Sequence, residues 1–378
     1  MSEAVKEKID YRALANKTIR DLTPYKPGKP IEELERELGI KSSIKLASNE
    51  NPLGASEKAI LAAQAALQQI EIYPDGSCYQ LKAALSQHLS IHSTQLTIGN
   101  GSENILEIII KSYLQPQHTA IISQYAFLTI PILLKSYGVT IKTIAATNWG
   151  HDIDAMLAAI DDSTKILFLV NPNNPTGTYT NQSDFDKLMQ ATPSRVLIVV
   201  DEAYAEYMAV NDYPNTLSYL QNHPNLILTR TFSKAHGLAG LRVGYAISSP
   251  DIADILNRAR LPFNVNHIAE KAAIAALSDT AHVEKSVALN LQGKAQLETA
   301  LLKLKLDYIP VIGNFITINV IDAEIIYQQL LYEGVIVRPL TAYDMPQHIR
   351  VTIGTYEQNE RFISALTKCL AAGKRNKA

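Results

Sequence analysis

The sequence predicts an α/β protein with a mostly parallel sheet of seven strands, helices on both faces, and a smaller α+β domain after it. Between residues 96 and 248, short runs rich in Val, Ile and Leu alternate with helical patterns, which is typical of strands buried on both faces. After about Pro262 this alternation gives way to a helix-rich block and then to short mixed elements. We therefore expect an N-terminal arm and linker over 1–45, a large domain over 46–262 and a small C-terminal domain over 263–378.

Each element follows from a local pattern. The predicted strands of the large sheet are residues 96–99, 119–123, 140–146, 165–170, 195–200, 226–231 and 243–248. The helices expected between them are 103–114, 127–137, 153–160 and 183–191, with Pro131 predicting a kink or a late start in the second. Earlier helices are expected at 32–38 and 56–69, after a proline-rich arm. The small domain is expected to hold extended segments at 315–320, 335–339 and 349–354 and helices at 323–333 and 359–370.

Composition narrows the classes of function. With 35 basic and 37 acidic residues, the chain offers no basic surface for nucleic acid or an anionic membrane. No apolar run reaches the roughly 18 residues of a membrane span, and the first eight residues are too polar for a signal peptide. The only cysteines are Cys78 and Cys369, and the histidines lack metal-ligand spacing. We therefore expect a cytoplasmic protein without a disulfide framework or a metal site.

The stretch after the strand at 226–231 carries the first catalytic candidate. Ser233 precedes Lys234 there, and Arg242 follows beyond two glycines. A lysine amine can form a Schiff base with an aldehyde cofactor, while a hydroxyl and a guanidinium can hold that cofactor's phosphate. Taken alone, a lysine at such a position is more often a solvated loop residue. The residues at the other strand ends therefore distinguish a cofactor-binding Lys234 from a solvated one.

Three further strand ends carry polar residues. Gly101 and Ser102 open the helix at 103–114, where free backbone N–H groups favour a phosphate, although a plain glycine turn with an N-cap serine has the same pattern. The loop at 171–177 holds three asparagines, and one amide there could contact a ring hydroxyl. Asp201 follows an apolar strand, where a buried carboxylate needs a partner such as a pyridinium N–H, unless it is simply a helix N-cap.

These strand ends meet the requirements of one cofactor. The spacings between Asn174, Asp201 and Lys234 are each about one strand–helix–strand unit, which places all three at one sheet edge together with the turn at 101–102. Pyridoxal phosphate needs an amine for C4′, a carboxylate for N1, an amide or phenol for O3′, and backbone N–H groups with Ser and Arg for its phosphate. Their joint occurrence favours a cofactor-binding lysine over a solvated one.

Longer motifs then identify a family. The strings N-P-N-N-P-T-G (171–177), D-E-A-Y (201–204) and S-K-A-H-G-L-A-G-L-R-V-G-Y (233–245) resemble fold-type I pyridoxal-phosphate enzymes of the class I/II aminotransferase superfamily. Within it, segments 22–30, 46–54, 73–76, 99–104, 337–340 and 348–355 resemble the histidinol-phosphate aminotransferases, so the resemblance covers nearly the whole chain. It implies the fold-type I architecture, a pyridoxal 5′-phosphate cofactor and a homodimer.

The resemblance also implies roles for individual residues. Lys234 would bear the cofactor and then carry the proton between Cα and C4′, Asp201 would pair with N1, and Asn174 and Tyr204 would contact O3′. The implied phosphate-binding groups are Gly101, Ser102, Glu103, Thr231, Ser233, Arg242 and, from the neighbouring subunit, Tyr73. Tyr125 would stack on the ring. The run Ser123-Gln124-Tyr125-Ala126-Phe127 departs from the Pro-Thr-Tyr that family members often carry, so Phe127 is a rival.

The resemblance implies transamination between L-histidinol phosphate and 2-oxoglutarate in histidine biosynthesis. Arg350 would bind the carboxylate of glutamate in one half-reaction and the substrate phosphate in the other, helped by Tyr25, Asn49 and Arg338. Alternatives are an aromatic amino acid aminotransferase, alone or with dual specificity, a threonine-phosphate decarboxylase, and a cofactor-binding regulatory module, although no DNA-binding stretch precedes Leu46. Tyr73 could instead be a turn residue, and Arg338 could only position its loop.

Overall fold

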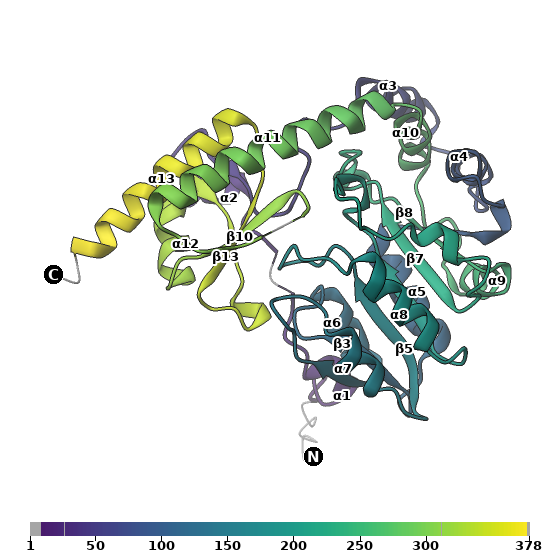
Figure 1. Cartoon of the computed structure of the whole chain (residues 1–378). Coiled ribbons are helices and arrows are strands. Elements are labelled where there is room, and N and C mark those ends of the chain that lie inside the picture. The colour runs from purple at the N-terminus through teal and green to yellow at the C-terminus, as the bar shows by residue number, and fades with distance from the viewer. Residues whose placement is uncertain (1–8, 26, 311, 376–378) are drawn as a thin grey trace, which may run out of the picture.

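The computed structural model describes residues 9–25, 27–310 and 312–375. Within these ranges, the main sheet has seven strands in the order β2-β8-β7-β6-β5-β3-β4. Figure 1 labels β3, β5, β7 and β8 of this sheet. The bounds of the strands are β2 (Leu96–Gly99), β3 (Thr119–Ser123), β4 (Thr140–Ile144), β5 (Thr164–Val170), β6 (Leu197–Asp201), β7 (Leu226–Thr231) and β8 (Gly244–Ser248). β8 is antiparallel to β2 and β7, and the remaining pairs are parallel. The predicted fold class is confirmed.

Helices cover both faces of this sheet because its strands are apolar on both sides. Along β5, Leu167 and Leu169 join one buried cluster, whereas Ile166 and Phe168 join another. The first cluster includes side chains of α4 (Tyr79–Leu89), α8 (Gln182–Ala191) and α10 (His267–Leu277). The second includes side chains of α5 (Ser102–Tyr113), α6 (Thr129–Ser136) and α9 (Pro250–Ala259). The sheet is therefore the middle layer of three.

Local signals placed most of these helices. α3 (Glu57–Ala66) begins after Ser56, whose hydroxyl accepts the N–H of Ala59. α6 begins at Thr129, which leaves Pro131 in its first turn, where a missing N–H costs no hydrogen bond. The sequence does not predict α4, because its buried stripe consists only of Leu81 and Leu85 and is too sparse to reveal a helical period. Between α3 and β2, pattern reasoning therefore missed one helix.

A second, smaller sheet lies beside the first in Figure 1. In the described part of the chain its order is β12-β13-β10-β9. These strands are β9 (Tyr308–Ile309), β10 (Phe315–Asn319), β12 (Arg338–Pro339) and β13 (His348–Thr352). They share a core with α11 (Thr280–Leu304), α12 (Ala323–Tyr332) and α13 (Tyr356–Arg375). The segment expected as one strand at 335–339 is divided, because β11 (Val335–Ile336) pairs instead with β1 (Ile44–Lys45) near the N-terminus.

The long helix α11 runs from the neighbourhood of α3 and α10 to that of α13 (Figure 1). Side chains of α10, such as Ala269 and Ala273, belong to the core of the main sheet, whereas Leu297 and Leu301 of α11 belong to that of the small sheet. The boundary expected at residue 262 stays a prediction.

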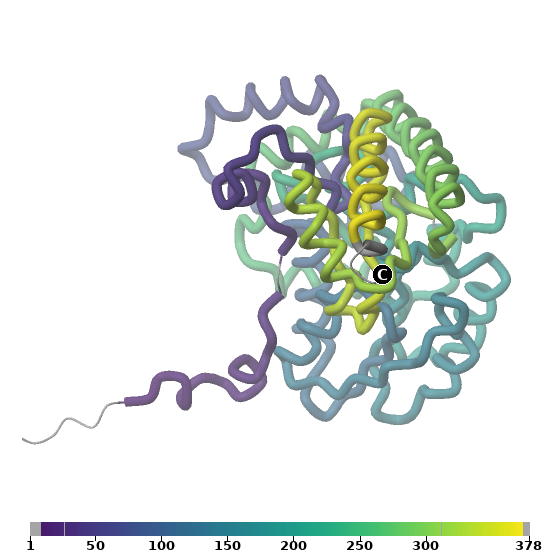
Figure 2. Tube along the Cα trace, turned by 90° about the vertical axis from the view of Figure 1, so that its left-hand side faces the viewer, coloured from purple at the N-terminus to yellow at the C-terminus, as the bar shows by residue number. Residues whose placement is uncertain are grey.

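At the other end of the chain, the arm that precedes α2 (Ile31–Leu38) extends away from the body (Figure 2). The hydroxyl of Thr18 in this arm donates to the backbone oxygen of Ser136 in α6.

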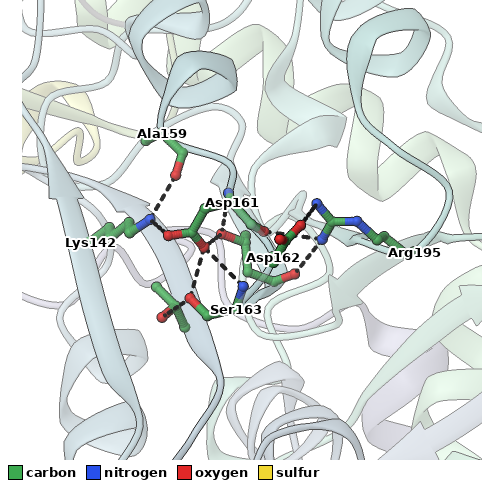
Figure 3. Close-up of polar contacts among 8 residues, drawn as sticks. Lys142, Ala159, Asp161, Asp162, Ser163 and Arg195 are labelled. Atoms are coloured by element: carbon green, nitrogen blue, oxygen red, sulfur yellow. Dashed lines mark hydrogen bonds and ion pairs between the residues drawn. The ribbon is translucent and has the colours of Figure 1, made fainter.

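A polar network ties the start of β5 to its neighbours (Figure 3). Asp161, just before β5, accepts hydrogen bonds from Lys142 of β4 at 2.6 Å and from Ser163 at 2.7 Å. Arg195, just before β6, donates to the backbone oxygen of Asp161 at 3.1 Å and lies 3.7 Å from Asp162. The hydrogen bonds, that from Lys142 foremost, hold the pKa of Asp161 well below its usual value. This network holds the amino ends of the strands, opposite to the edge where Asn174 and Asp201 lie.

None of the helices in the described ranges is both long and apolar enough to cross a membrane.

Candidate active site

A cavity of about 220 Å³ lies at the carboxyl edge of the main sheet. Residues that follow β2, β5, β6 and β7 line it, because these four strands point the same way. The lining residues are Ser48, Glu50, Ser102, Glu103, Phe127, Val170, Asn174, Asp201, Ala203, Tyr204, Thr231, Ser233, Lys234, Ala239 and Arg242. The structure thus brings together the polar residues that the strand-end argument placed at one edge.

Lys234 follows β7 and points into this cavity. Its Nζ donates to the backbone oxygen of Ser48 at 3.1 Å and lies 5.7 Å from the centre of the Tyr204 ring. Burial lowers the pKa of the Lys234 amine to about 8, and the charges of Arg350 and Arg242 act in the same direction. A lysine with a lowered pKa presents a larger fraction of neutral amine near neutral pH, and the neutral amine is the nucleophilic form.

Asp201 is the last residue of β6, and only 3% of it is exposed. Its Oδ1 accepts a hydrogen bond from the Thr229 hydroxyl at 3.0 Å. Burial raises the pKa of Asp201 to about 6, and the charges of Glu103 and Glu202 add to this effect. Among the residues that the structure describes, none forms an ion pair with Asp201, so this buried carboxylate is suited to a cationic N–H from a ligand.

The start of α5 and the segment after β7 form an anion cradle. Gly101 precedes α5 with φ 82°, and a Cβ at this position would lie 2.6 Å from Nη2 of Arg242. Arg242 donates to the Ser233 hydroxyl at 3.4 Å and lies 3.4 Å from the carboxylate of Glu103. The Thr231 hydroxyl donates to that of Ser233 at 3.0 Å. A helix N-terminus, two hydroxyls and a guanidinium together suit a phosphate group.

The loop after β5 presents one of its three asparagines to the cavity. Asn171 is bonded to the backbone of Thr180, and Asn173 donates to the backbone oxygen of Tyr125 at 3.0 Å, so both hold the loop. The side-chain oxygen of Asn174 accepts a hydrogen bond from Arg350. Because a guanidinium only donates, the amide NH₂ of Asn174 is left for an oxygen acceptor in the cavity.

Arg350, on β13 of the small sheet, reaches the side chain of Asn174 and is not itself among the residues that line the cavity. The Arg350 side chain is buried, donates to the backbone oxygen of Ala47 at 2.8 Å and lies 5.4 Å from the centre of the Phe315 ring. Its Nε is buried without a hydrogen-bond partner among the described residues. A buried guanidinium with an unused donor is well suited to bind an anionic group.

Asn49 and Tyr204 form one buried pair. The Asn49 amide donates to the Tyr204 hydroxyl at 2.9 Å, and burial raises the pKa of Tyr204 to about 12. Tyr204 lines the cavity, whereas Asn49 is not among its lining residues. Asn49 was predicted as a substrate contact, and the structure places it behind Tyr204, where it orients the phenol.

The two candidates for the stacking residue lie in different places. The ring of Tyr125, the candidate that the sequence favours, packs 5.5 Å from that of Trp149, against the core of the small sheet. Tyr125 is not among the residues that line the cavity, whereas its rival Phe127 is. The departure of residues 123–127 from the family motif was the sequence feature that pointed to Phe127 as the alternative to Tyr125.

Tyr73, Arg338 and Tyr25 are also absent from the cavity lining. Tyr73 is 79% exposed, and its ring stacks on Phe263 at 4.9 Å. The guanidinium of Arg338 lies 5.1 Å from the centre of the Tyr25 ring, and both residues line a neighbouring cavity under the N-terminal arm. Arg338 and Arg350 face each other across the β12–β13 pair. Arg338 therefore lies one strand further from Asn174 than Arg350 does.

Sequence reasoning missed two polar lining residues, Ser48 and Glu50. They flank Asn49 in the loop at 46–54, so the polar composition of that loop was the available signal. Glu50 pairs with Lys45 at 2.8 Å, and its charge raises the pKa of Lys234, against the effect of burial.

Known proteins are similar to this chain in sequence and fold over most of its length. Residues 41–366 match the family model described as aminotransferase class I and II. The chain belongs to this family. At 49% identity over 365 residues, this aminotransferase is similar to histidinol-phosphate aminotransferase 2 of Pseudomonas aeruginosa, with 96% of this chain and 99% of that protein covered. It is 48% identical over 358 residues to histidinol-phosphate aminotransferase 1 of Nitrosococcus oceani, with 94% and 97% covered.

Solved structures agree with the fold of this aminotransferase. The histidinol-phosphate aminotransferase from Sinorhizobium meliloti, in complex with pyridoxal-5′-phosphate, superposes with a TM-score of 0.87 at 26% identity and covers 95% of this chain and 98% of its own. A mutant aspartate aminotransferase of Thermus thermophilus reaches a TM-score of 0.81 at 20% identity, with 96% and 99% covered, and is similar in fold.

Proposed function

We propose that this aminotransferase uses pyridoxal 5′-phosphate to transfer the amino group of L-histidinol phosphate to 2-oxoglutarate. The products are imidazole-acetol phosphate and L-glutamate, and the reaction belongs to histidine biosynthesis. The observation that carries the proposal is the near full-length similarity to histidinol-phosphate aminotransferases at 48–49% identity. The buried Arg350 beside the cavity supports it, because both substrates carry an anionic group for a guanidinium to bind.

The residues of the cavity fit the cofactor. The carboxylate of Asp201 is buried without an ion-pair partner among the described residues, as a pyridinium partner requires. Gly101 leaves room beside Arg242 that a Cβ would fill, and the cradle around Ser102, Thr231 and Ser233 suits a phosphate. When bound, pyridoxal phosphate supplies a ring that accepts the electron pair released when the substrate Cα–H bond breaks.

The roles of the protein groups follow from their positions. Lys234 attaches the cofactor through Nζ and, once displaced by substrate, carries the proton away from the substrate Cα. Asp201 keeps the ring nitrogen protonated, because its negative charge favours the cationic form. Asn174, Tyr204 and Phe127 line the cavity. The Asn174 amide and the Tyr204 phenol would donate to the ring oxygen of a bound cofactor, and Phe127 would pack on its ring face.

Anion binding is divided between two guanidinium groups. Arg242, with the backbone N–H groups of Ser102 and Glu103 and the hydroxyls of Thr231 and Ser233, holds the cofactor phosphate. Arg350 binds the carboxylate of glutamate or 2-oxoglutarate in one half-reaction and the phosphate of histidinol phosphate in the other. Arg338 and Tyr25 lie beyond Arg350 and assist with the phosphorylated substrate.

We further propose that the active form is a homodimer in the cytoplasm. Tyr73 is exposed and lies outside its own cavity, so its phenol is free to reach the phosphate site of a second copy. Large apolar side chains near it are also exposed, namely Ile70, Ile72, Tyr79, Leu261 and Phe263. Cys78 and Cys369 are buried free thiols, which suits a reducing compartment.

A panel of amino donors against 2-oxoglutarate tests the substrate assignment. Histidinol phosphate is expected to have the highest kcat/KM, because its phosphate engages Arg350 together with Arg338 and Tyr25, whereas the carboxylate of an amino acid engages Arg350 alone. A preference for phenylalanine or tyrosine by more than about tenfold would instead identify an aromatic aminotransferase. Release of carbon dioxide from threonine phosphate without consumption of the oxo acid would identify a decarboxylase.

A further inference from the structure

A turn between β4 and α7 (Ile153–Ala158) has an unexpected residue at its tip. Thr147 and Gly150 exchange both backbone hydrogen bonds, at 3.1 and 2.9 Å. The two residues between them have positive φ angles, 51° at Asn148 and 66° at Trp149. A two-residue turn of this kind strongly prefers Asn-Gly, because a side chain at the second position is strained. A tryptophan in that place costs conformational free energy, which contacts elsewhere have to offset.

Those contacts connect the two sheets. The Trp149 ring lies 5.5 Å from the ring of Tyr125 and 5.1 Å, edge-on, from that of His348. Tyr125 in turn accepts a hydrogen bond through its backbone oxygen from Asn173, the neighbour of Asn174. His348 is buried at the start of β13. Trp149 therefore packs between the loops of the large sheet and the strand that carries Arg350.

The geometry of β13 relates this contact to Arg350. Residues two apart on a strand project to the same face, so His348 and Arg350 share one face of the small sheet. On the neighbouring strand β10, Thr317 pairs with Arg350 of β13. The Thr317 hydroxyl donates to the backbone oxygen of Pro175. This face consequently meets the loops of the large sheet at three points: Trp149 against His348, Thr317 on Pro175, and Arg350 on Asn174.

We propose that Trp149 is a positioning residue, whose indole packs against His348 and thereby holds Arg350 beside Asn174 in the geometry that binds the substrate anion. The inference rests on the anion-binding role of Arg350 given under the proposed function. Trp149 itself is not among the residues that line the cavity.

The substitution Trp149→Gly tests this directly, because glycine is the residue that the turn prefers. It removes the indole without breaking the turn. In the holoenzyme we expect it to weaken the binding of the unreactive dicarboxylate glutarate, measured by calorimetry, by about tenfold, since a small displacement of a binding group is enough for such a loss. The KM for 2-oxoglutarate should rise with it, while kcat and the affinity for pyridoxal phosphate change little. Trp149→Phe, which keeps a ring, should restore most of the glutarate affinity.

Two controls separate positioning from general structural damage. Tyr219→Leu removes another ring pair, with Phe185 at 5.1 Å, away from the cavity, and should leave glutarate binding unchanged. A double-mutant cycle of Trp149→Gly with His348→Gln should be non-additive, with the double variant no worse than the weaker-binding single variant. Full additivity of the two substitutions would overturn the proposed contact.

The outcomes also distinguish this inference from the proposed function. If Arg350→Met weakens glutarate binding and Trp149→Gly does not, the positioning role is wrong and the role of Arg350 stands. If Arg350→Met leaves glutarate binding unchanged, the anion-binding role fails and the positioning role fails with it. If Trp149→Gly lowers cofactor affinity as much as glutarate affinity, its effect is not directed at Arg350, and the inference is overturned.

Discussion

Arg350 donates a hydrogen bond to the side-chain oxygen of Asn174, although 176 residues separate them along the chain. Asn174 follows β5 of the main sheet, and Arg350 belongs to β13 of the small sheet. The bond occupies the side-chain oxygen of Asn174, which leaves its amide NH₂ for the cavity, and it brings a guanidinium suited to anions beside that cavity. This hydrogen bond therefore joins Asn174, which is proposed to contact the cofactor, to Arg350, which is proposed to bind the substrate anion.

The raised pKa of Asp201 predicts a cost in stability at neutral pH. Because this pKa lies at about 6 rather than 3.8, the folded protein without cofactor loses stability as pH rises from about 4 to 6. A shift of roughly two pH units corresponds to about 3 kcal/mol. Asp201→Asn should remove this loss, so the cofactor-free variant should be more stable than the wild type at pH 8 and similar to it near pH 4. Denaturant unfolding at both pH values measures this, and a variant that keeps the wild-type pH dependence would assign it to another group.

The lowered pKa of Lys234 predicts the pH dependence of cofactor attachment. Only the neutral amine attacks the aldehyde, and with a pKa of about 8 its fraction rises about tenfold per pH unit below that value. The rate at which the cofactor-free protein acquires the visible absorbance of bound pyridoxal phosphate should rise towards pH 8 and then level off. Lys234→Ala should bind the cofactor reversibly, without covalent attachment, and lose transaminase activity. A rate that keeps rising to pH 10 would indicate an unperturbed amine.

Phe127 and Tyr125 make opposite predictions for cofactor affinity. Phe127→Leu should weaken binding of pyridoxal phosphate by roughly tenfold, because it removes a ring contact worth about 1 kcal/mol or more. Tyr125→Leu should change this affinity little, because its ring packs on Trp149 outside the cavity. Equilibrium dialysis of the cofactor-free variants measures both constants, and the reverse order would restore Tyr125 as the stacking residue.

The exposed position of Tyr73 predicts complementation between subunits. Tyr73→Phe should weaken cofactor binding by about tenfold or more, because it removes a hydrogen bond to a charged group. A hybrid dimer of Tyr73→Phe with Lys234→Ala should regain about half of the wild-type activity, since one of its two cavities then has both native residues.

Each variant alone provides the baseline for this experiment. If the hybrid is no more active than half of the Tyr73→Phe homodimer, Tyr73 serves its own subunit or only shapes its turn.

Much of the main sheet could be predicted from the sequence because its signals are local. Apolar runs buried on both faces defined the strands. Gly101, Asn174 and Lys234 follow strands that end at one edge, and Asp201 is the last residue of another such strand. The helix α4 escaped prediction because two buried leucines define no period. The strand expected at 335–339 is divided because its first half pairs with residues near the N-terminus, and no local pattern contains such a partner.

The sequence by itself determined which side chains lie at the strand ends of the main sheet, because apolar strand runs and the polar residues after them are local patterns. The order of the strands, with β8 antiparallel between β2 and β7, came only from the structure. Only the tertiary structure decided which aromatic ring faces the cavity, because Tyr125 and Phe127 are only two residues apart. The ring of Tyr125 packs against Trp149, whereas Phe127 lines the cavity. The tertiary structure also decided that Asn49 supports Tyr204 and that Arg350 meets Asn174. These contacts join segments far apart in the chain, and they depend on how the small sheet packs against the loops of the large one.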